Sequence, residues 1–155
     1  TELIADRASY GIDVIIDYAH TPDAMRAALS GLRRKGGYLT VVFGCGGDRD
    51  SEKRPLMGRA AYEMCDRVIV TSDNPRTEDR GKIIDDILRG IPDGGCAVIP
   101  DRRSAIAYAI ESARPGETVA LMGKGHENYE TDAEGKHSFS ERDICRDVLR
   151  RKFGR

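Results

Sequence analysis

The chain has 155 residues, enough for one domain with a sizeable hydrophobic core. Its 25 basic and 26 acidic residues give a net charge of −1, which disfavours nucleic acid and anionic membranes as partners. No apolar run approaches the ~20 residues that span a bilayer. The four cysteines form no Cys-x-x-Cys pair, so the sequence indicates neither a zinc site nor a disulfide scaffold and is compatible with a reducing cytoplasm.

Short β-branched runs alternate with helical patterns along the chain. Thr21 and Pro22 are typical of a helix start, as an N-cap followed by proline at the first helical position. Ser140 with Asp143 predicts another start, for a last helix that reaches about Phe153. The predicted strands are 12–16, 38–43, 68–71, 97–99 and 118–122, and the other helices are 24–34, 55–64, 81–89 and 104–113. This order predicts one α/β domain over residues 1–155, a Rossmann-like three-layer fold with a mostly parallel sheet of about six strands flanked by helices.

Polar segments follow four of the predicted strands directly. In a parallel sheet the carboxyl ends of the strands share one edge, where ligands bind. We therefore expect these segments to meet there: Asp17 to His20, Gly44 to Asp50, Ser72 to Arg76, and Gly123 to Glu127.

Two familiar phosphate-binding patterns are absent from these segments. A phosphate loop requires G-x-x-x-x-G-K-S/T, but Thr118 occupies the first glycine position before Gly123-Lys124, and Gly125 follows the lysine. The loop at Gly44 has the order G-x-G-G, which does not match the dinucleotide pattern G-x-G-x-x-G. The sequence therefore lacks the usual means of holding an ATP triphosphate.

Charged side chains at this edge suit a zwitterionic ligand such as an amino acid. Arg49 and Arg76 offer guanidinium groups for a carboxylate, and Asp73 and Glu127 offer carboxylates for an ammonium group. Between them, Asn74 can donate and accept hydrogen bonds, and the proline that follows, Pro75, stiffens the loop. The alternative is that these groups pair with one another across the loops.

Other polar residues at the edge leave their roles open. His20 lies just before a helix start and could contact a base and ribose or serve a structural role. Cys45 lies in the glycine loop, where packing is the simpler interpretation and a reactive thiol the alternative. The roles of Lys124 and His126 are not fixed by the sequence.

Five motifs, in order and at compatible spacing, resemble the C-terminal domain of the Mur ligases, and in particular of those that add diaminopimelate during peptidoglycan synthesis. They are DYAHTPD at 17–23, FGCGGDRD at 43–50, KRPLMG at 53–58, DNPR at 73–76 and GKGHE at 123–127. The resemblance implies a bacterial cytoplasmic enzyme whose N-terminal domain holds a UDP-sugar and whose central domain carries the phosphate loop and magnesium ligands. This chain alone is then expected to show no turnover.

The resemblance also implies roles for individual residues. The residues expected to bind meso-diaminopimelate are Arg49, Asp73, Asn74, Pro75, Arg76, Gly123 and Glu127. Arg76 would bind the second carboxylate, and Glu127 the distal ammonium group. Asp17 and His20 would face the adenosine of ATP when the enzyme closes. No catalytic residue, metal ligand or tightly bound cofactor is expected here, and ATP, Mg²⁺ and the UDP-N-acetylmuramoyl-dipeptide would bind mainly through the other domains.

Two other interpretations remain. One is a folylpolyglutamate or cyanophycin synthetase domain, against which the DNPR and GKGHE motifs argue together. The other is a free-standing module that binds an amino acid or nucleotide without chemistry.

Overall fold

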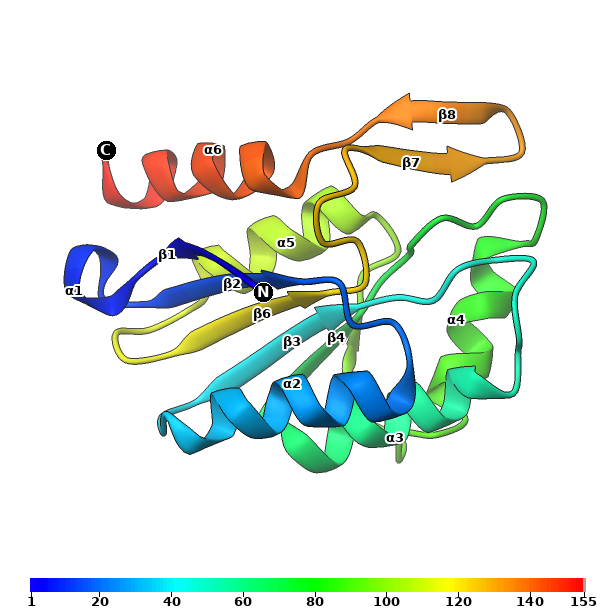
Figure 1. The fold of residues 1–155 in the computed structure, drawn as a ribbon, viewed down its shortest axis with the longest axis horizontal. Helices are drawn as coiled ribbons and strands as arrows, with labels where there is room; N and C mark the ends of the chain where they lie inside the picture. The colour runs from blue at the N-terminus through cyan, green and yellow to red at the C-terminus, as the bar shows by residue number, and fades with distance from the viewer. Residues whose placement is uncertain (155) are drawn as a thin grey trace.

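The computed structural model describes residues 1–154, which form a six-stranded sheet between two layers of helices (Figure 1). The strand order is β1-β2-β6-β3-β4-β5, and a separate hairpin, β7-β8, lies beside the sheet. Every sheet pairing is parallel except that of the edge strand β1 with β2. The strands are β1 (Glu2–Ala5), β2 (Asp13–Asp17), β3 (Leu39–Phe43), β4 (Arg67–Val70), β5 (Ala97–Val98), β6 (Thr118–Met122), β7 (Tyr129–Asp132) and β8 (Gly135–Ser138).

Helices cover both faces of the sheet. The helices α2 (Pro22–Arg34), α3 (Lys53–Met64) and α4 (Arg80–Leu88) pack on one face, and α5 (Arg102–Glu111) and α6 (Glu141–Phe153) on the other. A short helix, α1 (Arg7–Tyr10), links β1 to β2. Alternate residues of β2, β3, β4 and β6 enter the two cores; in β3, for example, Val41 lies in one and Val42 in the other. Because both faces are covered, β3 and β6 are buried along their whole length, which explains why four of the five residues in each are apolar.

The helix starts follow the capping residues of the sequence. The Thr21 side chain accepts a hydrogen bond from the backbone N–H of Ala24, and Pro22 is the first residue of α2. The Ser140 hydroxyl accepts one from the N–H of Asp143 at 3.2 Å. The predicted α/β class, the mostly parallel sheet and these helix starts are confirmed.

The sequence analysis did not predict β1, α1 and the hairpin. In β7 and β8 the sequences YETD and GKHS lack an apolar alternation, because neither face of the hairpin packs into a core. The edge strand β1 has only four residues, of which Ala5 alone is buried. The strand β1 and the hairpin are held in place by contacts with distant parts of the chain, which local sequence patterns cannot predict.

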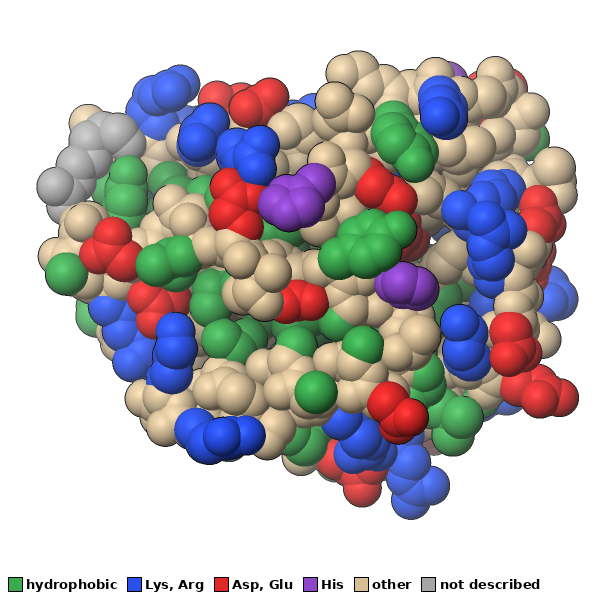
Figure 2. Space-filling model, viewed as in Figure 1, with side chains coloured by type: hydrophobic (Ala, Val, Ile, Leu, Met, Phe, Trp, Pro, Cys, Tyr) green, Lys and Arg blue, Asp and Glu red, His purple; other side chains and the backbone are tan. Residues whose placement is uncertain are grey.

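The surface matches the balanced charge of the sequence. Figure 2 shows basic, acidic and hydrophobic side chains interspersed over one face of the molecule. Among the described residues, no helix is long and apolar enough to cross a membrane.

Candidate functional site

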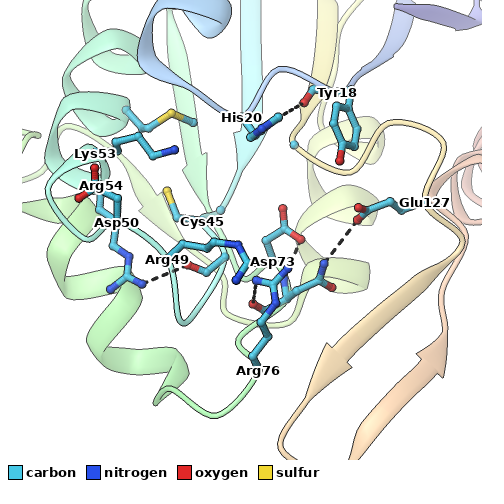
Figure 3. A pocket seen from close by; sticks show the side chains of 15 residues that line it. Tyr18, His20, Cys45, Arg49, Asp50, Lys53, Arg54, Asp73, Arg76 and Glu127 are labelled. Atoms are coloured by element: carbon cyan, nitrogen blue, oxygen red, sulfur yellow. Dashed lines mark hydrogen bonds between the residues drawn. The ribbon is translucent and has the colours of Figure 1, made fainter.

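The loops after β2, β3, β4 and β6 surround a cavity of about 260 Å³ at the carboxyl edge of the sheet (Figure 3). All four predicted segments contribute to its wall, as parallel strand ends require. Its lining residues are Tyr18, His20, Gly44, Cys45, Gly46, Arg49, Asp50, Lys53, Arg54, Met57, Asp73, Asn74, Arg76, Gly123 and Glu127.

Arg76 is placed in this wall by an unusual backbone. Its φ of 53° lies in the left-handed region, which is uncommon for a residue with a side chain. Its N–H donates to the carbonyl of Thr131 in the hairpin at 3.0 Å. Its Nη1 donates to the carbonyls of Gly47 at 2.9 Å and Asn74 at 3.3 Å. Within residues 1–154 no carboxylate forms an ion pair with this guanidinium group, so its charge remains available to a ligand.

Arg49 is the second cation of the wall. It is exposed, and its Nη1 donates to the carbonyl of its neighbour Asp48 at 3.0 Å. It too forms no ion pair with a carboxylate in the part of the chain that the structure describes. Arg49 and Arg76 therefore bring two uncompensated guanidinium groups to one opening (Figure 3).

The glycines of the second loop allow it to approach the DNPR loop closely. A Cβ atom on Gly47 would lie 1.8 Å from the carbonyl oxygen of Pro75, and one on Gly46 would lie 2.7 Å from Nη1 of Arg76. The N–H of Gly47 also donates to the carbonyl of Asn74 at 2.7 Å. The two loops are thus fixed to each other by backbone contact.

We predict that Gly47→Ala destabilises the chain by roughly 1–3 kcal/mol, because the methyl group would force these two backbones apart. Gly31→Ala is the matched control, since a Cβ atom at this position in α2 meets nothing within 4 Å. Urea unfolding of both variants provides the measurement. Equal stability of the two would show that the second loop does not need its glycine.

Asp73 pairs within the protein. Its Oδ1 lies 3.1 Å from Nζ of Lys124, which is fully buried. Burial alone would raise the pKa of Asp73, but the charges of Arg102 and Lys124 outweigh it and hold this pKa below its usual range. For Asp73, therefore, the alternative of pairing across loops holds.

Glu127 and Asn74 lie on different loops, and their side chains meet in the wall of the cavity. The Asn74 Nδ2 is 3.4 Å from Oε1 of Glu127 (Figure 3). Gly123 lines the cavity with a φ of 114°, and a Cβ atom there would come within 2.9 Å of Asp73 Oδ2. Pro75 does not line the cavity; its contribution is to the backbone packing against Gly47.

The two residues expected near a nucleotide, Asp17 and His20, differ in their relation to the cavity. His20 lines the cavity, with its Nδ1 3.0 Å from the carbonyl of Tyr18 and its ring edge-on to the tyrosine. Asp17 lies outside the lining; it accepts a hydrogen bond from the N–H of Ala19 at 2.8 Å and another from the hydroxyl of Thr1. Of the two, only His20 reaches the cavity.

Cys45 and His126 do not contribute an evident nucleophile. Burial raises the pKa of the Cys45 thiol to about 12, so it is protonated at neutral pH, which favours the packing interpretation. His126 is largely exposed and lies outside the lining of the cavity.

One supporting residue was not recognised in the sequence analysis. Arg54 is buried beneath the loop at Gly44 and pairs with Glu78 at 2.6 Å and Asp86 at 2.9 Å. It also donates to the carbonyl of Gly46 at 3.1 Å. Its place in the KRPLMG motif was the available signal, but the carboxylates that pair with it lie in a different segment.

We expect this ion pair to be sensitive to acid. Hydrogen bonds from Arg54 and from the Asp48 N–H hold the pKa of Glu78 well below its ordinary value of 4.5. A depressed carboxyl pKa stabilises the folded state above the ordinary value, and this stability is lost as the pH falls below it. The free energies of unfolding of the wild type and Glu78→Gln should therefore converge in acid. A gap that stays constant as the pH falls would contradict the assignment.

The residues that could together bind a metal ion lie outside the cavity. Within residues 1–154, the group of three close enough to share an ion consists of Asp132, Glu134 and His137 on the hairpin. None of them lines the cavity, and Nε2 of His137 is 2.9 Å from Asp132 Oδ1.

Comparison with known proteins identifies the family. The family model described as "Mur ligase, glutamate ligase domain" matches residues 1–125. The chain belongs to this family. The resemblance of the five motifs to the C-terminal domain of the Mur ligases is thereby confirmed.

Several similar relatives are diaminopimelate ligases. The UDP-N-acetylmuramoyl-L-alanyl-D-glutamate--2,6-diaminopimelate ligase of Trichormus variabilis is 53% identical over 140 residues, covering 89% of this chain and 28% of the relative. A solved structure of a ligase of the same name matches with a TM-score of 0.91 and 43% identity, over 97% of this chain and 31% of that one. The chain therefore spans under a third of the length of these relatives.

Folylpolyglutamate synthases are more distant. That of Thermotoga maritima is 27% identical and has a TM-score of 0.54, over 73% of this chain and 25% of that one. The lower identity and structural similarity agree with the argument from the DNPR and GKGHE motifs.

Proposed function

We propose that this chain is the amino-acid-binding domain of an ATP-dependent ligase that adds meso-diaminopimelate to UDP-N-acetylmuramoyl-L-alanyl-D-glutamate. Its relatives at about 50% identity carry the name of that activity. The bacterial cytoplasm, where ATP is available, is the compartment that such a reaction requires.

The observation that carries this proposal is the pair of uncompensated guanidinium groups, Arg49 and Arg76, around a cavity that Glu127 also lines. Diaminopimelate has a carboxylate and an ammonium group at each end, whereas lysine has a carboxylate at only one. Two arginines match two carboxylates, and Glu127 provides a counter-charge for an ammonium group. The cavity therefore has the charges that distinguish the two amino acids.

Selectivity follows from the cost of leaving a buried charge without a partner. Arg76 is partly buried, and its guanidinium group donates to two backbone carbonyls, which do not neutralise its charge. A ligand carboxylate would form charge-assisted hydrogen bonds with the guanidinium group, while lysine would leave it uncompensated.

In the proposed reaction, ATP activates the D-glutamate carboxyl group as an acyl phosphate. The amine of diaminopimelate then attacks the carbonyl carbon, an amide bond forms and phosphate leaves. This domain's part is to hold the amino acid so that one amine points out of the cavity, and proximity accounts for its catalytic effect.

Because the chain lacks a phosphate-loop pattern, we assign triphosphate and Mg²⁺ binding to other parts of the ligase, with His20 facing the nucleotide in the closed state. Asp17 would join it if closure releases its contact with Thr1.

Calorimetric titration of the chain with meso-diaminopimelate and with L-lysine tests the proposal. We expect tighter binding of diaminopimelate. Tighter binding of lysine than of diaminopimelate would contradict the proposal. So would an affinity for both that is no higher than the affinity for an amino acid with an uncharged side chain.

A further inference from the structure

Lys124 is a buried cation that the proposed reaction does not use. Its side chain is 0% exposed and it is absent from the lining of the cavity. Its Nζ lies 2.9 Å from Asn74 Oδ1, 3.1 Å from Asp73 Oδ1 and 3.2 Å from the carbonyl of Tyr129. These three acceptors match the three N–H groups of an ammonium ion. A ligand in the cavity therefore cannot touch Lys124, and any effect on binding must pass through its partners.

Two of these partners, Asp73 and Asn74, line the cavity, and Asn74 is the one whose side chain has hydrogen-bond donors as well as an acceptor. Its Oδ1 accepts from Lys124 Nζ and, at 2.9 Å, from the backbone N–H of Thr131 in β7. An ammonium group and a backbone N–H are donors only, so both require an acceptor at this position. If the amide rotated by half a turn, its NH₂ group would face two other donors. The nitrogen is thereby directed to the other side, toward Glu127 (Figure 3).

We propose that Lys124 is a positioning residue, which fixes the Asn74 amide with its nitrogen toward the cavity and so gives the cavity a hydrogen-bond donor for a carboxylate of the bound amino acid. The identity of this amino acid rests on the proposed function. The orientation of the amide does not, since it follows from the contacts within the chain.

A purely structural role for Lys124 makes a different prediction. Lys124 also neutralises the buried carboxylate of Asp73, and that role contributes to stability whether or not Asn74 is present. If Lys124 acts on binding through Asn74, its effect must disappear when the Asn74 side chain is removed. A double-mutant cycle measures this coupling.

The binding arm uses meso-diaminopimelate as the probe. Lys124→Met should weaken binding about tenfold, the scale of one hydrogen bond to a charged group. In an Asn74→Ala background the same substitution should change the dissociation constant little. Lys35→Met, at the exposed end of α2, is the control and should change it in neither background. An equal loss in both backgrounds would overturn the proposal.

A second arm needs no ligand. The side-chain amide protons of Asn74, observed by NMR, should show nuclear Overhauser contacts to Glu127 in the wild type, and Lys124→Met should weaken them as the amide rotates. If that variant does not fold, Asp73→Asn/Lys124→Met removes both charges of the buried pair and takes its place. An unchanged amide in the folded variant would refute the positioning role. Failure of the wild type to bind diaminopimelate, with the amide behaving as expected, would instead count against the proposed function alone.

Discussion

Replacing Arg76 with alanine is expected to weaken binding of meso-diaminopimelate by about 10- to 100-fold and to leave the affinity for L-lysine nearly unchanged. The reason is that its guanidinium group has no carboxylate partner among residues 1–154, so a ligand carboxylate would supply one. Arg76→Lys should recover only part of the loss, because an ammonium group cannot form the bidentate pair. Competitive calorimetric titration of both amino acids against each variant measures the two affinities.

Arg114→Ala is the control for this prediction. Arg114 is exposed and precedes β6, at the opposite edge of the sheet from the cavity. The Arg114→Ala variant should bind both amino acids with the affinities of the wild type. A parallel loss of affinity for diaminopimelate and lysine in Arg76→Ala would show that Arg76 does not discriminate between them.

Arg102→Met is expected to cost about 3–5 kcal/mol of unfolding free energy, the largest effect on stability that we predict. Arg102 and Glu141 are both buried and lie 2.8 Å apart, so the substitution leaves a buried carboxylate without its partner. Arg102 also donates to the carbonyls of Ser72 at 3.0 Å and Met122 at 2.9 Å. It therefore ties together the ends of β4 and β6, from which two of the cavity loops depart.

Two further variants separate the causes of this loss. Arg103→Met, at the adjacent exposed position of α5, should change the unfolding free energy little. Arg102→Met/Glu141→Leu removes both charges and should recover much of the stability, because an apolar pair can replace a buried ion pair. Urea unfolding of all three provides the comparison. A loss of under about 1 kcal/mol in Arg102→Met would mean that the pair does not stabilise the strand ends.

The main elements of the sheet could be predicted because each leaves a local signal. The strands β2, β3 and β6 are covered on both faces, so most of their residues are apolar. The helix starts at Thr21 and Ser140 carry capping residues whose hydrogen bonds lie within three residues. The hairpin β7-β8 has neither kind of signal, because its contacts to Asn74 and Arg76 are between residues more than fifty positions apart.

The candidate site, too, could be predicted only in part from the sequence. The meeting of four loops followed from the parallel order of the strands, and six of the seven residues expected to bind the amino acid line the cavity. The exception is Pro75. What the sequence could not show is which charges pair within the protein: Asp73 with Lys124, and Arg54 with Glu78. These pairs depend on side-chain directions at loops far apart in the chain, which no spacing rule predicts.

The location of bound diaminopimelate tests the central claim most directly. Proton–nitrogen NMR spectra of the chain, recorded as meso-diaminopimelate is added, would map the residues whose amide signals shift. We predict saturable shifts concentrated at Arg49, Asn74, Arg76, Gly123 and Glu127, around the cavity. Shifts confined to another surface, such as the groove between α5 and α6, or no saturable shift at all, would contradict the account.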